Sequence, residues 1–416
     1  MGIFDEFQKE EAPVKEEGGQ QAGGGEIIAY ETVGERKIYF IRDQNKVSLS
    51  PEDLQRNTNN MSLKKLLSEM FHSGSSDLHL TVGSQPCARL DGKVFRMYQY
   101  LPLTADKVQQ LTYSVLKDKQ KKDFEQNNEL DFSFGIKGLS RFRANMFKQR
   151  GAIACAMRTI PYDILDFKKL ALPPAVDDFV ELPKGLVLVT GPTGSGKSTT
   201  LASMIDYINK HKPHHIITIE DPIEYIHNHR LSIINQRQIG EDTDSFPTAL
   251  KYVLREDPDV IMIGEMRDLE TIGAAITIAE TGHLVFATLH TNSAIESINR
   301  MIDVFPAHQQ SQIRTQLSFV LQGVMTQMLL PKASGTGRVL VAEVLVPNAA
   351  VRAMIREDKL HQIYSSMQTG KQFKMQTMNE CLAVSVKAGK ITKSEALANT
   401  MNKDELRELF KHYGVG

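Results

Sequence analysis

The sequence predicts an α/β protein in which an α+β domain comes first, a parallel-sheet domain follows, and helices close the chain. Three observations predict this class. Strand-like segments separated by turns fill residues 77–160 of the 416-residue chain, strands and helices alternate through residues 184–347, and helical patterns dominate residues 348–416. A chain of this length is expected to form two or three domains.

Composition argues against several classes of protein. Lys and Arg total 49 and Asp and Glu total 50, so a net charge of −1 gives no argument for binding nucleic acid or an anionic membrane. The cysteines, Cys87, Cys155 and Cys381, form no C-x-x-C pair, so we expect neither a disulfide framework nor a zinc site. No apolar run approaches the roughly 20 residues that span a bilayer, and the acidic N-terminus lacks a signal-peptide core. We therefore expect a cytoplasmic protein without membrane insertion.

Residues 1–60 are predicted to form an extension ahead of the first domain. Residues 1–25 are rich in charge and glycine, which favours disorder. A short docking peptide is the alternative there, with the anchors Ile3, Phe4 and Phe7. Residues 26–50 carry strand-like pieces, and Ser50 before Pro51 is typical of a helix start. The sequence leaves open whether this part folds alone or packs on the first domain.

Residues 61–160 are predicted to form the first domain. The amphipathic stretch 62–74 is expected to be a helix, and a second helix is expected from its N-cap Thr104 to about Glu125. Asp91 and Gly92 mark a hairpin turn. Strands are expected at residues 77–82, 86–97, 130–136 and 140–160. An antiparallel sheet with helices packed against it accounts for this order.

Residues 161–183 hold several prolines and are predicted to be a linker, and residues 184–347 are predicted to form the second domain. Its elements are expected as strands at 185–190, 214–221, 259–265 and 283–289 and as helices after the first strand and at 246–255 and 269–281. This alternation predicts a parallel sheet with crossover helices, as in RecA-like ATPase cores. Residues 348–416 are predicted to be a helical region.

The stretch GPTGSGKS matches the phosphate-binding pattern G-x-x-x-x-G-K-[ST], the P-loop, and lies between a buried strand and a helical pattern. Its glycines let the backbone turn N–H groups toward phosphate, and the following helix adds its positive end. Lys197 is expected to reach the β- and γ-phosphates of ATP, and Ser198 to bind Mg²⁺. The predicted ATP-binding residues are Gly191, Thr193, Gly194, Ser195, Gly196, Lys197, Ser198 and Thr199.

Three further groups follow predicted strands, at the edge where an open α/β sheet binds its ligand. Glu220 can hold Mg²⁺ or a water bound to it, or can belong to an ordinary charged turn. Glu265 follows an apolar strand in a Walker-B arrangement with Gly264 in place of the usual Asp, and it can orient the attacking water or contact the metal through water. His290 is either a sensor of the γ-phosphate or a structural histidine.

Five stretches together resemble a known family. They are SSDLHL (75–80), GPTGSGKSTT (191–200), IEDPIEY (219–225), REDPDVIMIGEMRDLETI (255–272) and TGHLVFATLHTNSA (281–294). With them, the chain resembles the secretion-type ATPases of type IV pili and type II secretion, and most closely the pilus retraction motors, from about Met61 to about Gln372.

The resemblance implies a PAS-like N-terminal domain joined to a RecA-like domain, assembled as a homohexamer that hydrolyses ATP with Mg²⁺ at subunit interfaces. It implies a motor for pilus retraction and twitching motility that works with a platform protein at the inner face of the cytoplasmic membrane. In this family pattern Glu265 is the catalytic carboxylate, Glu220 lies near the metal and His290 belongs to a histidine motif. The candidates for arginine fingers are Arg141, Arg143 and Arg158.

Some features depart from the family pattern. Ala350–Glu357 differs from the AIRNLIRE helix of retraction motors at the Ile and Asn-Leu positions but keeps its charge and apolar spacing. Ala287 replaces a common Gly, and residues 1–60 have no usual counterpart. The C-x-x-C insertion of many assembly motors is missing from the sequence. The alternatives are a paralogous, assembly or secretion ATPase and an accessory subunit without hydrolysis. A nucleic-acid translocase is the weakest interpretation, because no basic tract with interleaved aromatic residues occurs.

Overall fold

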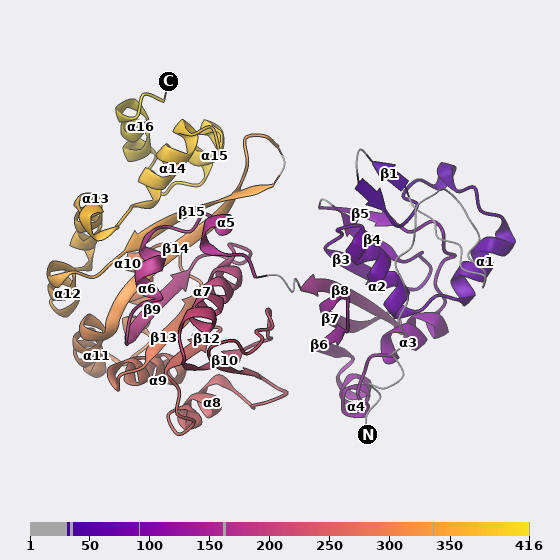
Figure 1. Cartoon of the computed structure of the whole chain (residues 1–416), viewed down its shortest axis with the longest axis horizontal. Coiled ribbons are helices and arrows are strands. Elements are labelled where there is room, and N and C mark those ends of the chain that lie inside the picture. The colour runs from indigo at the N-terminus through magenta and orange to yellow at the C-terminus, as the bar shows by residue number, and fades with distance from the viewer. Residues whose placement is uncertain (1–30, 34–35, 91, 161–163, 336, 416) are drawn as a thin grey trace. The chain divides into compact units, whose positions relative to one another are not determined.

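The computed structural model describes residues 31–33, 36–90, 92–160, 164–335 and 337–415 (Figure 1). The chain divides into two compact units, Met1–Pro161 and Tyr162–Gly416. The predicted disorder of residues 1–25 and the alternative docking peptide lie outside the described residues. Among the described residues, no helix is both long and apolar enough to cross a bilayer.

The first unit is built on a six-stranded antiparallel sheet with the order β5-β4-β3-β8-β7-β6. Its strands are β3 (Asp77–Leu80), β4 (Cys87–Leu90), β5 (Lys93–Arg96), β6 (Glu129–Ile136), β7 (Ser140–Gln149) and β8 (Ala152–Ile160). Its helices are α1 (Pro51–Asn59), α2 (Leu63–His72), α3 (Ala105–Tyr113) and α4 (Asp118–Asn127). The sheet and the helices α2, α3 and α4 bury one shared apolar core, as the sequence predicts for an α+β domain.

Two predicted elements of this unit are each divided in the structure. The single helix expected from Thr104 to Glu125 is wrong, since α3 ends at Tyr113 and α4 begins at Asp118. Near the break, the hydroxyls of Thr112 and Ser114 donate to carbonyls of the preceding turn, a bond that competes with the helix ladder. The strand expected over 140–160 is a hairpin that turns at residues 150 and 151, both with positive φ. Thr104 is confirmed as an N-cap.

The segment before Met61 packs on the rest of the first unit. A short hairpin, β1 (Glu31–Val33) and β2 (Arg36–Ile38), leads into it. Ile38, Phe40 and Ile41 are buried in the core of the unit. Farther along, the Asn57 amide donates to the carbonyl of Gln99 at 3.3 Å, and Ser50 caps α1 as predicted. The sequence left open whether this part folds alone or packs on the first domain. Among the residues that the structure describes, it packs on the first domain.

The second unit is built on a seven-stranded sheet with the order β11-β10-β12-β13-β9-β14-β15, parallel except for the last strand. Its strands are β9 (Gly185–Thr190), β10 (His215–Glu220), β11 (Ile233–Gln238), β12 (Val260–Ile263), β13 (Leu284–Leu289), β14 (Leu321–Pro331) and β15 (Arg338–Leu345). The four strands expected here are confirmed, whereas β11, β14 and β15 were not predicted.

Helices cover both faces of this sheet, which explains why its central strands β9, β12 and β13 are buried at every position. One face packs on α6 (Ala175–Phe179) and α7 (Lys197–His211) through residues such as Val187 and Phe286. The other face packs on α8 (Phe246–Val253), α9 (Leu269–Glu280), α10 (Ala294–Asp303), α11 (Ala307–Val320) and α12 (Ala349–Arg356). A further short helix, α5 (Phe167–Leu170), lies in the predicted linker.

The C-terminal region is helical, as predicted. Its remaining α-helices are α13 (Ile363–Thr369), α14 (Met378–Lys387), α15 (Lys393–Ala398) and α16 (Lys403–His412). Leu382 of α14 and Leu406 and Phe410 of α16 form a separate small core with Leu330 and Val341 of the β14–β15 hairpin. The hairpin therefore connects the C-terminal helices to the central sheet.

Candidate nucleotide-binding and catalytic site

The predicted site residues of the second unit follow adjacent parallel strands. The P-loop follows β9, His290 follows β13 and Glu265 lies just beyond β12, and these three strands are consecutive in the sheet. Glu220 is the last residue of β10, the next strand along. Because the carboxyl ends of parallel strands meet at one edge, the fold brings these residues to the same edge, where α/β sheets bind ligands.

The P-loop has the backbone of an anion cradle. Gly191, Gly194 and Gly196 all have positive φ, a conformation that glycine adopts without steric cost. A Cβ atom at Gly191 would collide with the carbonyl oxygen of Gln327, so only glycine fits this close approach. The 15-residue helix α7 begins at Lys197 without a side-chain cap. Its first N–H groups and positive end are therefore available to an anion.

Lys197 is buried at the start of α7 and lies on the loop itself. Its ammonium group donates to the carbonyls of Gly191 at 2.9 Å and Pro192 at 3.1 Å. Burial lowers the pKa of Lys197, while the charges of Glu265 and Glu224 act in the opposite direction. Glu224 is an exposed carboxylate of this neighbourhood that the sequence analysis did not select, although it lies in the stretch with Glu220.

The other predicted loop residues differ in their surroundings. Thr193, Gly194 and Ser198 are exposed, whereas Ser195 is buried. The Ser195 hydroxyl has no hydrogen-bond partner among the described residues, and the Thr199 hydroxyl pairs with that of Tyr225 at 2.9 Å. The exposed hydroxyls of Thr193 and Ser198 are therefore open to a ligand from solvent, and that of Ser198 lies in the first turn of α7.

Gln327 in β14 supports the P-loop and was missed by the sequence analysis. Its side chain is fully buried. The amide nitrogen donates to the carbonyl of Ser195 at 2.8 Å, and the amide oxygen accepts from the hydroxyl of Thr200 at 3.1 Å. No local sequence signal could have identified it, because it lies more than 120 residues from its partners.

Glu265 is held by two basic side chains. Arg267 donates to both carboxylate oxygens, from Nε at 2.5 Å and from Nη2 at 2.7 Å, and His290 Nε2 lies 3.2 Å from Oε1. Burial raises the pKa of Glu265, but the hydrogen bond from Arg267 and the charges of His290, Arg267 and Lys197 outweigh it, so the pKa lies below its usual value. The structure thus joins Glu265 and His290, as expected, and adds Arg267.

Glu220 is buried, and its carboxylate is occupied by hydrogen bonds. Thr218 donates to Oε1 at 2.6 Å and Gln236 donates to the same oxygen at 3.1 Å. The backbone N–H of Glu224 donates to Oε2 at 3.4 Å. Burial raises the pKa of Glu220, and these bonds oppose that effect. In this arrangement Glu220 stabilises the turn after β10.

The three candidate arginines belong to β7 and β8 of the first unit, whereas the P-loop belongs to the second unit. Arg158 forms an ion pair with Asp77 at 2.8 Å, and Arg141 donates to the hydroxyl of Ser133 at 2.6 Å. Arg143 is exposed and pairs in register with Arg158 across the two strands. Arg143 and Arg158 thus lie side by side on the sheet.

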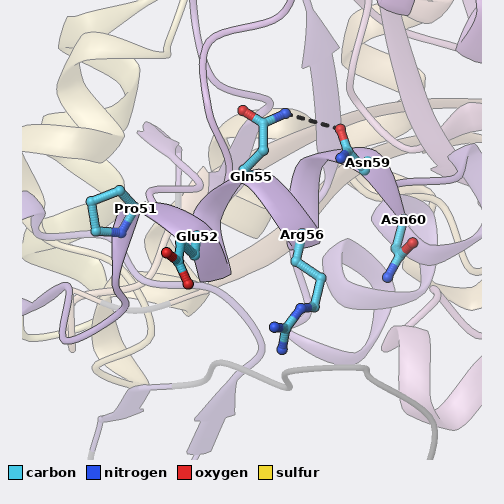
Figure 2. A pocket seen from close by; sticks show the side chains of 6 residues that line it. All are labelled: Pro51, Glu52, Gln55, Arg56, Asn59 and Asn60. Carbon is cyan, nitrogen blue, oxygen red and sulfur yellow. Dashed lines mark hydrogen bonds between the residues drawn. The ribbon is translucent and has the colours of Figure 1, made fainter.

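A hollow of about 550 Å³ on α1 contains none of the predicted site residues (Figure 2). Its lining is Pro51, Glu52, Gln55, Arg56, Asn59 and Asn60. Gln55 and Asn59 bond to each other at 2.9 Å along the helix. The hollow is an open surface along one helix, away from the P-loop residues.

Comparisons with known proteins agree with this geometry. The family model described as "Type II/IV secretion system protein" matches residues 54–398. The type IV pilus retraction ATPase PilT of Pseudomonas aeruginosa is 49% identical over 336 residues, which cover 81% of this chain and 97% of that protein. A twitching motility protein of Neisseria gonorrhoeae is 48% identical over 322 residues, covering 77% of this chain and 86% of that protein.

A solved structure is similar as well. The crystal structure of the pilus retraction motor PilT with bound ADP matches with a TM-score of 0.80 and 52% identity, and the match covers 84% of this chain and 100% of that one. The chain therefore belongs to the type II/IV secretion system protein family, and within it to the group that includes the pilus retraction ATPase PilT.

Proposed function

We propose that this chain is an ATP hydrolase that powers type IV pilus retraction and, through it, twitching motility. The observation that carries the proposal is the shared sheet edge, which gathers an uncapped P-loop helix, Lys197 and the Glu265–His290 pair. The match to the retraction ATPase at 49% identity covers 97% of that protein, which supports the specific role.

The site residues suggest how hydrolysis proceeds. The P-loop N–H groups and Lys197 bind the β- and γ-phosphates of ATP, and Lys197 exchanges its present carbonyl partners for phosphate oxygens. Glu265 accepts a hydrogen bond from the attacking water and orients it toward the γ-phosphorus. His290 lies beside Glu265, where it can report on the γ-phosphate. Arg267 must loosen its hold for Glu265 to face the water.

The residues also fit Mg²⁺. Among the described residues, no group of three or more His, Cys, Asp or Glu side chains could hold a metal unaided. Mg²⁺ typically takes one or two protein ligands together with substrate phosphates, and Ser198 and Glu265 are the residues that would hold it here, Glu265 through water. When bound, Mg²⁺ neutralises charge that develops on the phosphate oxygens.

We further propose a RecA-like core, a PAS-like first domain and a homohexameric ring. The strand order of the second sheet, with β13 between the P-loop strand and β12, supports the first assignment. The antiparallel sheet with helices supports the second. Arg143 and Arg158, which pair in register on one sheet, are the candidates for arginine fingers in such a ring. Such a ring would work with a platform protein at the cytoplasmic face of the inner membrane.

The test is steady-state ATP hydrolysis by the full chain, with particle size and ATP binding measured in the same buffer. Glu265→Gln should bind ATP but lose about 100-fold or more in kcat, since the attacking water loses the charged carboxylate that accepts its proton. Lys197→Ala should lose ATP binding. Glu270→Gln is the matched control, because Glu270 is exposed in the same segment. Near-normal turnover by Glu265→Gln would remove Glu265 from the mechanism.

The direction of the motor is tested in cells. Loss of the gene should leave surface pili that no longer retract, because assembly continues without disassembly. Cells without pili would favour an assembly motor instead. ATP binding without turnover by a monomeric wild-type chain would favour the accessory-subunit alternative.

A further inference from the structure

Glu343 in β15 is a buried carboxylate with no role in the motifs described above. Its side chain is 4% exposed. Its Oε1 accepts the backbone N–H of Ala294 at 2.8 Å, and the carboxylate also accepts the backbone N–H of Met378. Burial raises the pKa of Glu343, and these two bonds oppose that effect. A charged group is costly to bury unless it is well bonded, so the position calls for an explanation.

The two donors begin two helices. Ala294 is the first residue of α10, directly after the loop 290–293 that carries His290, and Met378 is the first residue of α14. The N-caps Ser293 and Thr377 accept N–H groups farther along each helix, from Glu296 and Glu380. Glu343 therefore satisfies N–H groups that the ordinary caps do not, and its carboxyl group lies at the N-terminal ends of both helices.

Hydroxyl groups hold the same loop from a second side. Thr291 pairs with Ser297 at 2.7 Å, and Ser297 donates to Thr190 at 3.4 Å. Thr190, the last residue before Gly191 of the P-loop, pairs with Thr326 at 2.8 Å. Thr326 lies directly opposite Glu343 in the β14–β15 register. All five of these side chains are buried: Thr190, Thr291, Ser297, Thr326 and Glu343. The end of β9 and the loop with His290 therefore share one interior polar network.

We propose that Glu343 is a positioning residue for ATP hydrolysis: it fixes the start of α10, sets His290 against Glu265, and links that loop to the C-terminal helices through α14. The inference rests on the proposed roles of His290 and Glu265 in hydrolysis. Glu343 does not touch the reacting groups, since its bonds go to the backbone of Ala294 and Met378. Its effect should therefore appear in the chemical step and not in ATP binding.

The experiment measures kcat and KM of the full chain for Glu343→Gln, alone and in a His290→Ala background. Glu343→Gln keeps the side-chain shape but leaves one acceptor oxygen, so kcat should fall about tenfold or more with an unchanged KM. In the His290→Ala background the same change should alter kcat less than about twofold, because the residue acts through His290. Equal losses in both backgrounds would overturn the inference.

Two further variants complete the test. Glu395→Gln is the matched control, since the Glu395 carboxylate accepts from Asn399 at 2.9 Å within the C-terminal region; its kcat should be unchanged. Ala294→Pro removes the N–H donor and leaves Glu343 in place, and it should reproduce the kcat loss. Proline suits the first helical position, and Ser293 (φ −151°, ψ 162°) already has the extended conformation required before it.

The outcomes separate this inference from the proposed function. A wild-type chain without ATPase activity would overturn both. An active wild-type chain whose kcat is unchanged by both Glu343→Gln and Ala294→Pro would overturn this inference alone. If Glu343→Gln does not fold, Ala294→Pro decides: a tenfold lower kcat supports the inference and an unchanged kcat overturns it.

Discussion

At the scale of single residues, the state of Glu265 is decided by Arg267. The guanidinium of Arg267 is largely exposed, yet it binds both carboxylate oxygens. A fork of this kind stabilises the ionised carboxylate and also occupies the oxygens that a water would use. Arg267 therefore favours the ionised form of Glu265 while limiting its access to water.

Removing Arg267 should change the pH dependence of hydrolysis. In Arg267→Ala the ionised form of Glu265 loses its main partner, so its pKa should rise and the acid limb of kcat/KM should move to higher pH. The measurement is the pH profile of the full chain. Arg255→Ala is the control, since Arg255 is exposed and close in sequence. An acid limb that stays at the wild-type pH would show that Arg267 does not set this pKa.

The P-loop and Glu265 were predictable from the sequence because each is a local pattern, a glycine-rich turn or an apolar strand followed by a carboxylate. Arg267 lies within a stretch used for the family resemblance but was not selected. Gln327 and Glu343 could not be predicted, because they lie on a strand hairpin that shows no site motif and their partners are distant in sequence.

At the scale of elements, the connection between β10 and β11 contains a buried neutral histidine. His227 Nδ1 is buried and has no partner among the described residues. Burial lowers the pKa of His227 to about 4, although Asp206 acts in the opposite direction. The backbone N–H of His227 donates to Gln236 in β11 at 2.9 Å, which ties the connection to the sheet.

This histidine should make the second unit sensitive to acid. An unfolded chain binds a proton at His227 below about pH 6.5, whereas the folded chain does so only near pH 4. The contribution of His227 to the free energy of unfolding is therefore fully present above about pH 6.5. As the pH drops toward 4, the free energy of unfolding falls by about 3 kcal/mol. His227→Leu should lose this part of the pH dependence in chemical denaturation, and His308→Gln, at an exposed site, should keep it. Parallel curves for His227→Leu and wild type would contradict the prediction.

At the scale of the whole molecule, the N-terminal segment decides how stable the first unit is. Ile38, Phe40 and Ile41 are buried in its core, and the backbone of Ile41 bonds to Gln99 and Tyr98. The family resemblance begins at about Met61. A shortened chain that starts at this residue would lack these three side chains. The segment is thus a structural part of the unit and not only an appendage.

A chain that starts at Met61 should show a destabilised first unit. Losing three buried side chains costs roughly 5–9 kcal/mol, at about 1.5–3 kcal/mol each. Calorimetry should show a lower melting temperature for the first unit and an unchanged transition for the second. Phe40→Ala should reproduce a loss of about 3 kcal/mol, while Lys46→Ala at an exposed position should not. An unchanged first transition would contradict this account.

The sequence by itself determined the fold class, most strands of the parallel sheet, the P-loop, Glu265 and the family. These features are written in patterns a few residues long, whose periodicity and spacing reflect local backbone geometry and burial. Tertiary structure alone decided that residues 37–60 pack into the first unit and that Arg158 is paired with Asp77. It also decided that β14 brings Gln327 to the P-loop and that β15 brings Glu343 to the start of α10. Those contacts join residues far apart in the chain, and strand order and register create them, which no local pattern records.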